Sequence, residues 1–243
     1  MSLKIIKIRR SQDRFSTSRE WLSSKHSFSF AEHRDPKWDN FGNIRVINED
    51  IISPNAGFNT HSHFNMEIIT VVTKGAITHR DSLNNFGKIH EDEVQVMSAG
   101  TGISHSEKNE ENETCKLFQI WIIPQKENIK PHYDQISLKE KLWDNLIFNY
   151  KSGQNNKLFV NQDISLWRCK YKPIKEKRLP LKIDKYNWIQ IIEGKLLLKS
   201  KDTHSNICLS SGDGLGFEVI NYDDISIDTE KELDFLLFSM PSL

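Results

Sequence analysis

The chain has 243 residues, and its 33 basic and 33 acidic side chains give a formal net charge of zero. This balance argues against a chain-wide cationic surface for nucleic acid or for an anionic membrane. The hydrophobic fraction of 37% is typical of a folded protein, and no apolar run approaches the roughly 20 residues of a membrane helix. We therefore expect a soluble protein with no direct nucleic-acid or membrane partner.

Short segments of alternating apolar and polar residues dominate the chain, and this period of two predicts strands. Residues 1–10 alternate charged and apolar side chains, which predicts a strand rather than a signal peptide. Further strands are expected at 43–47, 66–72, 93–97, 116–123, 188–193 and 233–238. A polar connector bounded by two prolines covers 124–131, and the capping-box pattern from Ser137 to Glu140 predicts a short helix after it.

The two halves of the chain resemble each other in three places. A strand, a glycine turn and a second strand occur at 66–78 and again at 188–198, and residues 90–97 are echoed by 211–217. Both halves also end in an apolar strand that runs into a proline. Three matches in the same order predict two tandem β-barrels or sandwiches. We place the first domain at residues 1–132 and the second at 133–243.

Two histidine motifs in the first half predict a metal site. His61 and His63 are two residues apart, as are His105 and Glu107, and on a strand such pairs point to the same face. An H-x-H pair alone is as consistent with a solvent-exposed strand face as with a metal site. The H-x-E motif about 40 residues later favours metal, because three imidazoles and a carboxylate suit one divalent transition ion.

The nearby Glu67 is an even number of residues from His63, so an uninterrupted strand would point both to the same face, and it is a second candidate carboxylate. It is interpreted as an alternative ligand, a partner that holds an imidazole tautomer, or a general base. For His79 we expect a hydrogen-bonded or solvated strand histidine rather than a fifth ligand. The second half has His204 as its only histidine, so we expect no comparable metal site there.

Cys115, Cys169 and Cys208 are odd in number and widely spaced. This spacing argues against a disulfide framework and against a C-x-x-C metal or redox site. We expect three free cysteines and a reducing, cytoplasmic location.

The first half resembles the two cupin motifs, and nearly the whole chain is similar to the pirin-like bicupins. The resemblance is carried by residues 26–31, by the H-x-H motif, by the S-A-G-T-G-I-S-H-S-E sequence of 98–107, and by 119–124. Ser62 stands where the family commonly has proline. The resemblance implies an all-β fold of two tandem cupin barrels, also called double-stranded β-helices or jelly rolls, with a few short helices.

The resemblance also implies a metal, usually iron, held by the residues that match His61, His63, His105 and Glu107, while the match to Glu67 is generally not a ligand. Fe(II) is therefore expected, with Mn, Ni, Cu and Zn as alternatives. Several family members are similar to quercetin 2,3-dioxygenases, which open a flavonol with dioxygen, so a small aromatic substrate is expected.

Glu107 or Glu67 would take the proton of the flavonol hydroxyl in such a reaction. The alternative is a redox-sensing, iron-binding regulator that acts through a protein partner. A metal-dependent isomerase is a third alternative.

Overall fold

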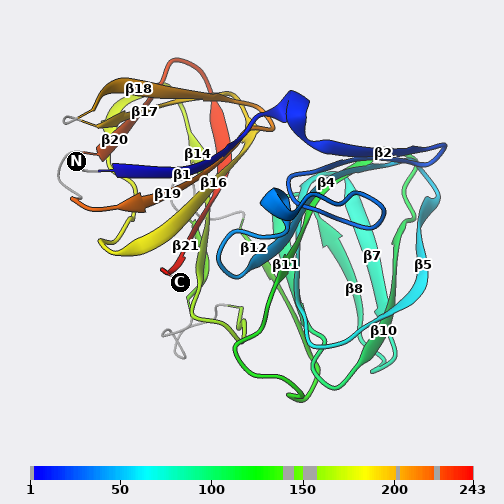
Figure 1. The fold of residues 1–243 in the computed structure, drawn as a ribbon. Helices are drawn as coiled ribbons and strands as arrows, with labels where there is room; N and C mark the ends of the chain where they lie inside the picture. Colours follow the sequence, from blue (N-terminus) through cyan, green and yellow to red (C-terminus); the bar gives the residue numbers. More distant parts are fainter. Residues whose placement is uncertain (1–2, 139–144, 150–157, 201–202, 222–224, 243) are drawn as a thin grey trace. The chain divides into compact units, whose positions relative to one another are not determined.

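The computed structural model describes residues 3–138, 145–149, 158–200, 203–221 and 225–242. Strands dominate these residues, which confirms the all-β prediction (Figure 1). The described helices are two short 3-10 turns, Ser11–Asp13 and Pro36–Trp38. No helix in the described ranges is long and apolar enough to cross a membrane. The expected helix after Ser137 falls mostly outside the described residues.

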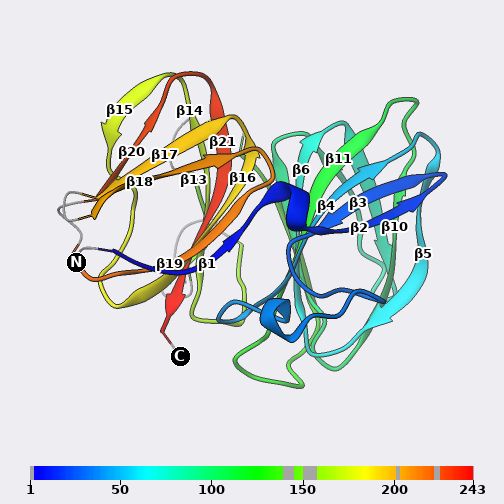
Figure 2. The same cartoon turned by 45° about the horizontal axis from the view of Figure 1, so that its top comes forward.

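The chain divides into two compact units, as Figures 1 and 2 show. The N-terminal barrel contains Phe15–Glu140 and Tyr150–Gln162, and the C-terminal barrel contains Met1–Arg14, Lys141–Asn149 and Asp163–Leu243. Each barrel is built from two antiparallel sheets, in which every strand can bury one face against the facing sheet.

The N-terminal barrel has a seven-stranded and a four-stranded sheet. The larger has the order β12 (His132–Ser137), β9 (Glu93–Ser98), β6 (Glu67–Lys74), β11 (Cys115–Ile122), β4 (Ile44–Ile52), β3 (Leu22–His26), β2 (Phe15–Arg19). The smaller has the order β5 (Ala56–His63), β10 (Ile103–Asn109), β7 (Ala76–Asp81), β8 (Phe86–His90).

The C-terminal barrel has a six-stranded and a four-stranded sheet. The larger has the order β1 (Leu3–Arg9), β19 (Gly214–Val219), β16 (Lys185–Glu193), β21 (Leu233–Pro241), β14 (Ser165–Tyr171), β13 (Asn145–Asn149). The smaller has the order β15 (Ile174–Lys177), β20 (Ile225–Thr229), β17 (Lys195–Ser200), β18 (Thr203–Ser210).

This division of the chain differs from the expected boundary at residue 132. The expected first strand exists as β1, but it pairs with β19 of the C-terminal barrel, where the blue and orange strands lie side by side in Figure 1. Strand β12 begins at His132 and pairs with β9, so it extends the N-terminal barrel beyond the connector. These pairings join residues far apart in sequence, and local periodicity carries no information about such partners.

The predicted internal duplication is visible in the central strands. Strand β6, Gly75 and β7 in one barrel correspond to β16, Gly194 and β17 in the other. Both glycines have positive φ, +73° for Gly75 and +95° for Gly194, and a Cβ on either would press against a neighbouring carbonyl oxygen. Glycine is therefore required at both turns.

The interiors of the two barrels differ in polarity. Among the described residues of the C-terminal barrel, a large apolar cluster includes Ile189 and Ile191 of β16. In the N-terminal barrel, one apolar cluster lies around Val72 and another around Ile68. Between those two residues on the same strand face lies the buried Thr70, whose hydroxyl donates to Glu107. The N-terminal barrel thus carries a polar patch in its core.

Candidate metal centre and pocket

Strands β5 and β10 bring the two predicted motifs together. In their antiparallel register His105 lies opposite His61, and Ile103 lies opposite His63. The Nε2 atoms of His61 and His105 are 3.1 Å apart. The ring centroid of His63 lies 4.8 Å from the ring centroid of His61 and 5.0 Å from that of His105. The three imidazoles therefore converge, and their ligand atoms all lie within 4.8 Å of one another.

Burial lowers the pKa of two of these imidazoles, those of His63 and His105. Desolvation, followed by repulsion from neighbouring histidines, lowers the pKa of His63 to about 4 and that of His105 to about 2. His63 Nε2 is buried and has no hydrogen-bond partner among the described residues. A neutral imidazole has a free lone pair, and an unpaired buried nitrogen is costly unless it finds a partner. The three histidines thus fit the requirements of a divalent transition metal.

Glu107 lies on β10 beside His105, and its ligand atoms group with those of His105 rather than with those of His61 and His63. The register of β10 against β5 shifts between His105 and Glu107, where β5 has one extra residue. The buried carboxylate of Glu107 accepts hydrogen bonds from Thr70 Oγ1 at 3.2 Å and Gln119 Nε2 at 2.9 Å. Desolvation raises its pKa to about 7. Together with His105 and His79, Glu107 forms a second group whose ligand atoms lie within 4.8 Å of one another.

The structure does not bring Glu67 to this cluster. Its Oε2 accepts hydrogen bonds from Ser98 Oγ at 2.6 Å and from the backbone N–H of Asn161 at 3.1 Å. Its neighbour Ile68 packs in the barrel interior, so Glu67 points to the opposite face of β6. Burial raises the pKa of Glu67. The parity argument from His63 does not hold, because β5 ends at His63 and Asn65 turns the chain with a φ of +46°.

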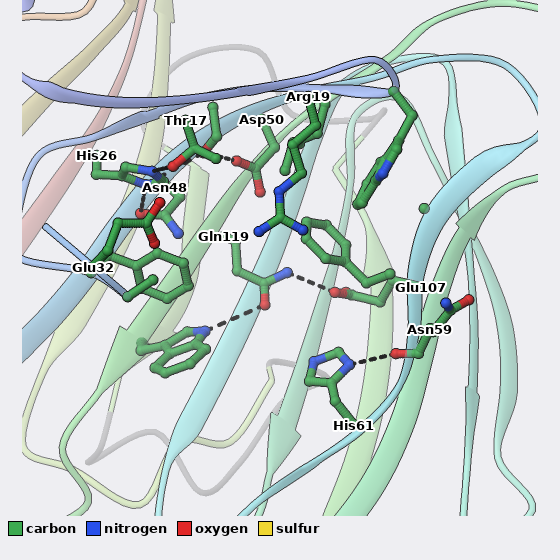
Figure 3. A pocket seen from close by; sticks show the side chains of 18 of the residues that line it. Thr17, Arg19, His26, Glu32, Asn48, Asp50, Asn59, His61, Glu107 and Gln119 are labelled. Atoms are coloured by element: carbon green, nitrogen blue, oxygen red, sulfur yellow. Dashed lines mark hydrogen bonds between the residues drawn. The ribbon is translucent and has the colours of Figure 1, made fainter.

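A pocket of about 550 Å³ opens onto the histidines (Figure 3). His61, His63 and Glu107 lie in its wall. Aromatic side chains form its sides in two edge-to-face pairs: Trp21 with Phe58 at 5.1 Å, and Phe30 with Trp121 at 5.4 Å between ring centroids. Such a lining suits a flat aromatic ligand.

Another part of the pocket wall is polar. His26 contacts Thr17 through Nε2 at 2.9 Å and Asn48 through Nδ1 at 2.8 Å. Ser24 donates to Asp50, whose pKa is raised to about 7 by burial. Figure 3 shows Arg19 pointing into the space between Asp50 and Gln119. The pocket therefore combines aromatic walls with polar groups that can bind ligand hydroxyls.

Comparison with known proteins places the chain in a family. A family profile described as Pirin matches residues 8–122, and one described as Quercetinase C-terminal cupin domain matches residues 149–240. A quercetin 2,3-dioxygenase of Escherichia coli is 34% identical over 98% of this chain and 99% of its own length. The chain belongs to the pirin family. A pirin-like protein of Caulobacter vibrioides is 57% identical over 104 residues, which cover 43% of this chain and 45% of that protein.

Solved pirin structures agree with this assignment. The crystal structure of YhhW from Escherichia coli superposes with a TM-score of 0.87 at 34% identity, covering 98% of both chains. A structure of the bacterial pirin YhhW in complex with nickel(II) gives the same TM-score at 33% identity, covering 98% of this chain and 99% of that one. The predicted bicupin fold is confirmed, and the histidine and glutamate groups of this pirin-family chain have the composition of a metal site.

Sequence reasoning missed the partners of these residues. His79 was expected to be a hydrogen-bonded or solvated histidine rather than a ligand, and its Nε2 lies 3.0 Å from Asp81 Oδ2 in the barrel interior. Asp81 was not singled out, although His79 and Asp81 form an H-x-D motif with the same spacing as the other two pairs. Gln119 was not singled out either, and only its contact with Glu107 reveals its place.

Proposed function

We propose that the N-terminal barrel is the active site of a metal-dependent dioxygenase that cleaves a flavonol-type substrate with molecular oxygen. The observation that carries the proposal is the convergence of three imidazoles, two of which, those of His61 and His63, line an aromatic-walled pocket. The quercetin 2,3-dioxygenase name of the Escherichia coli relative supports the reaction class.

His61, His63, His105 and Glu107 are the proposed ligands, and Fe(II) is the proposed ion. Nitrogen and oxygen donors of this kind also accept Mn, Ni, Cu and Zn, and the nickel(II) complex of YhhW supports a first-row divalent ion. Bound there, the ion supplies Lewis acidity for an ionised substrate hydroxyl and electron exchange with dioxygen.

The side chains of the pocket have separate tasks in this proposal. Trp21 and Phe58 hold the flat rings of the flavonol, and the apolar walls exclude water from the reacting face. The Glu107 carboxylate accepts the proton of the 3-hydroxyl, while Gln119 donates to Oε2 and fixes the orientation of that carboxylate. Glu67 lies outside the pocket lining, so Glu107 is favoured over Glu67 as the proton acceptor.

The test is turnover of quercetin by the iron-loaded protein with and without air. The proposal expects loss of flavonol absorbance only in air, with one dioxygen consumed and one carbon monoxide released per flavonol. A His61→Ala variant should lose this activity. Turnover without oxygen would refute the dioxygenase, and a metal-loaded protein that turns over no flavonol would favour the regulatory alternative.

A further inference from the structure

His79 and Asp81 lie beside the proposed ligands but have no part in the function proposed above. In the antiparallel register of β7 and β10, His79 lies opposite Glu107 and Asp81 lies opposite His105. Directly opposed residues of an antiparallel pair point to the same face of the sheet. The H-x-D motif of β7 is therefore placed against the H-x-E motif of β10.

A series of close contacts runs through these residues. His105 Nε2 faces His61 Nε2 at 3.1 Å, and His105 Nδ1 lies 3.4 Å from His79 Nδ1. His79 Nε2 then lies 3.0 Å from Asp81 Oδ2. The side chains of His79 and Asp81 have no exposed area, and His105 is fully buried. The contacts that His79 makes with His105 and Asp81 therefore lie inside the barrel.

One placement of protons satisfies the whole series. If His105 offers its Nε2 lone pair to a metal, its single proton is on Nδ1 and is donated to His79 Nδ1. His79 must then carry its own proton on Nε2, where the acceptor is the Asp81 carboxylate. We propose that His79 and Asp81 are positioning residues that hold His105 in the tautomer and ring orientation needed for metal binding. This inference rests on the proposed metal site.

Asp81 and His79 have further contacts outside the series. Asp81 Oδ1 accepts the backbone N–H groups of Leu83 and Asn85 at 2.9 and 3.0 Å, and Oδ2 also accepts from Asn85 Nδ2. The Tyr133 ring lies over His79 with 4.7 Å between the centroids. The carboxylate and the imidazole plane are thus both fixed from outside the series, as expected of groups that orient a ligand.

The same geometry argues against His79 as a ligand in its own right. His79, His105 and Glu107 have ligand atoms within 4.8 Å of one another, which by distance alone would allow a second ion. Both ring nitrogens of His79 are already engaged, Nδ1 with His105 and Nε2 with Asp81. A metal at His79 would have to break one of these contacts inside the barrel.

The variant Asp81→Asn tests the series. Its amide can keep the oxygen that accepts from Leu83 and Asn85, but it turns an N–H₂ group toward His79 Nε2. His79 would then carry its proton on Nδ1 and force the proton of His105 onto Nε2. We expect Co(II) affinity, measured by chelator competition, to fall 10- to 100-fold, with altered visible bands of the remaining Co(II) complex.

The matched control is Asn85→Ala, which removes one donor to Asp81 and leaves the contact with His79 in place. It should bind Co(II) within about twofold of the wild type. Equal losses in both variants would assign the effect to the loop at 82–85 and overturn the inference. Wild-type affinity in Asp81→Asn would overturn it as well.

Histidine ¹⁵N NMR of the Zn(II)-loaded wild-type protein reads the tautomers without any variant. The inference expects protons on His105 Nδ1 and His79 Nε2, and a proton on His79 Nδ1 would overturn it. Neither measurement uses a flavonol. A protein that binds metal through this series but turns over no flavonol would therefore refute the proposed reaction and leave the inference intact.

Discussion

Asp50 is a buried carboxyl in the pocket wall, and replacing it with asparagine should stabilise the metal-free protein at neutral pH. Only 3% of Asp50 is exposed, and burial raises its pKa from 3.8 to about 7. The folded state therefore binds this proton more tightly than the unfolded state. The stability that protonated Asp50 gives to the folded state is fully present below pH 3.8 and is lost as the pH rises through about 7.

The size of the effect follows from the shift. About three pKa units correspond to about 4 kcal/mol, at about 1.4 kcal/mol per unit, as the most that ionisation of Asp50 can cost the folded state. Asparagine keeps an oxygen that accepts from Ser24 and has no charge to desolvate. The increase in the free energy of unfolding caused by Asp50→Asn should therefore be small at pH 4 and should grow until about pH 7 to 8.

Urea denaturation of both proteins from pH 4 to 8.5, with chelator present, measures this difference. A stability difference that does not change with pH, or a variant less stable than the wild type at pH 8, would refute the reasoning. A stabilised variant that binds quercetin less tightly would show that the pocket keeps this carboxyl for function at the expense of stability.

Three further predictions concern the carboxylates and the metal. Glu67→Gln should leave flavonol turnover within about twofold of the wild type, because Glu67 does not line the pocket; a loss of 100-fold in kcat would return Glu67 to the active site. Gln119→Leu removes a hydrogen-bond donor to the buried Glu107 and should weaken metal binding about tenfold. Chelator competition on the folded variant and on the wild type measures this difference. Removing the metal with chelator should lower Tm, since an ion that binds only the folded state stabilises it, and an unchanged Tm would contradict a bound ion.

The sequence predicted the parts of the site that depend on local geometry. The period of two on a strand paired His61 with His63 and His105 with Glu107, and in the structure the members of each pair share a group of neighbouring ligand atoms. Side-chain alternation is a property of each strand alone, so it can be read from the sequence. The same argument was wrong about the placement of Glu67, since the turn at Asn65 separates β5 from β6. Residues two apart point to the same face only within an uninterrupted strand.

Features that depend on pairing between distant strands were beyond the sequence. The contact between His105 and His79 requires the register of β10 against β7, and the membership of β1 in the C-terminal barrel requires its pairing with β19. Many registers are compatible with any one alternating pattern, so only the folded barrel selects among them. The H-x-D motif at 79–81 was nevertheless visible in the sequence, as a third motif with the spacing of the other two.

We propose that one divalent transition ion is held by His61, His63, His105 and Glu107. Elemental analysis can check this for the purified wild-type protein and for His105→Ala, after loading with Fe(II) without air and removal of excess ion. We expect close to one ion per chain in the wild type and less than about a tenth of that in the variant, with both folded by circular dichroism. Equal metal content in the two proteins, or none in the wild type, would contradict the claim.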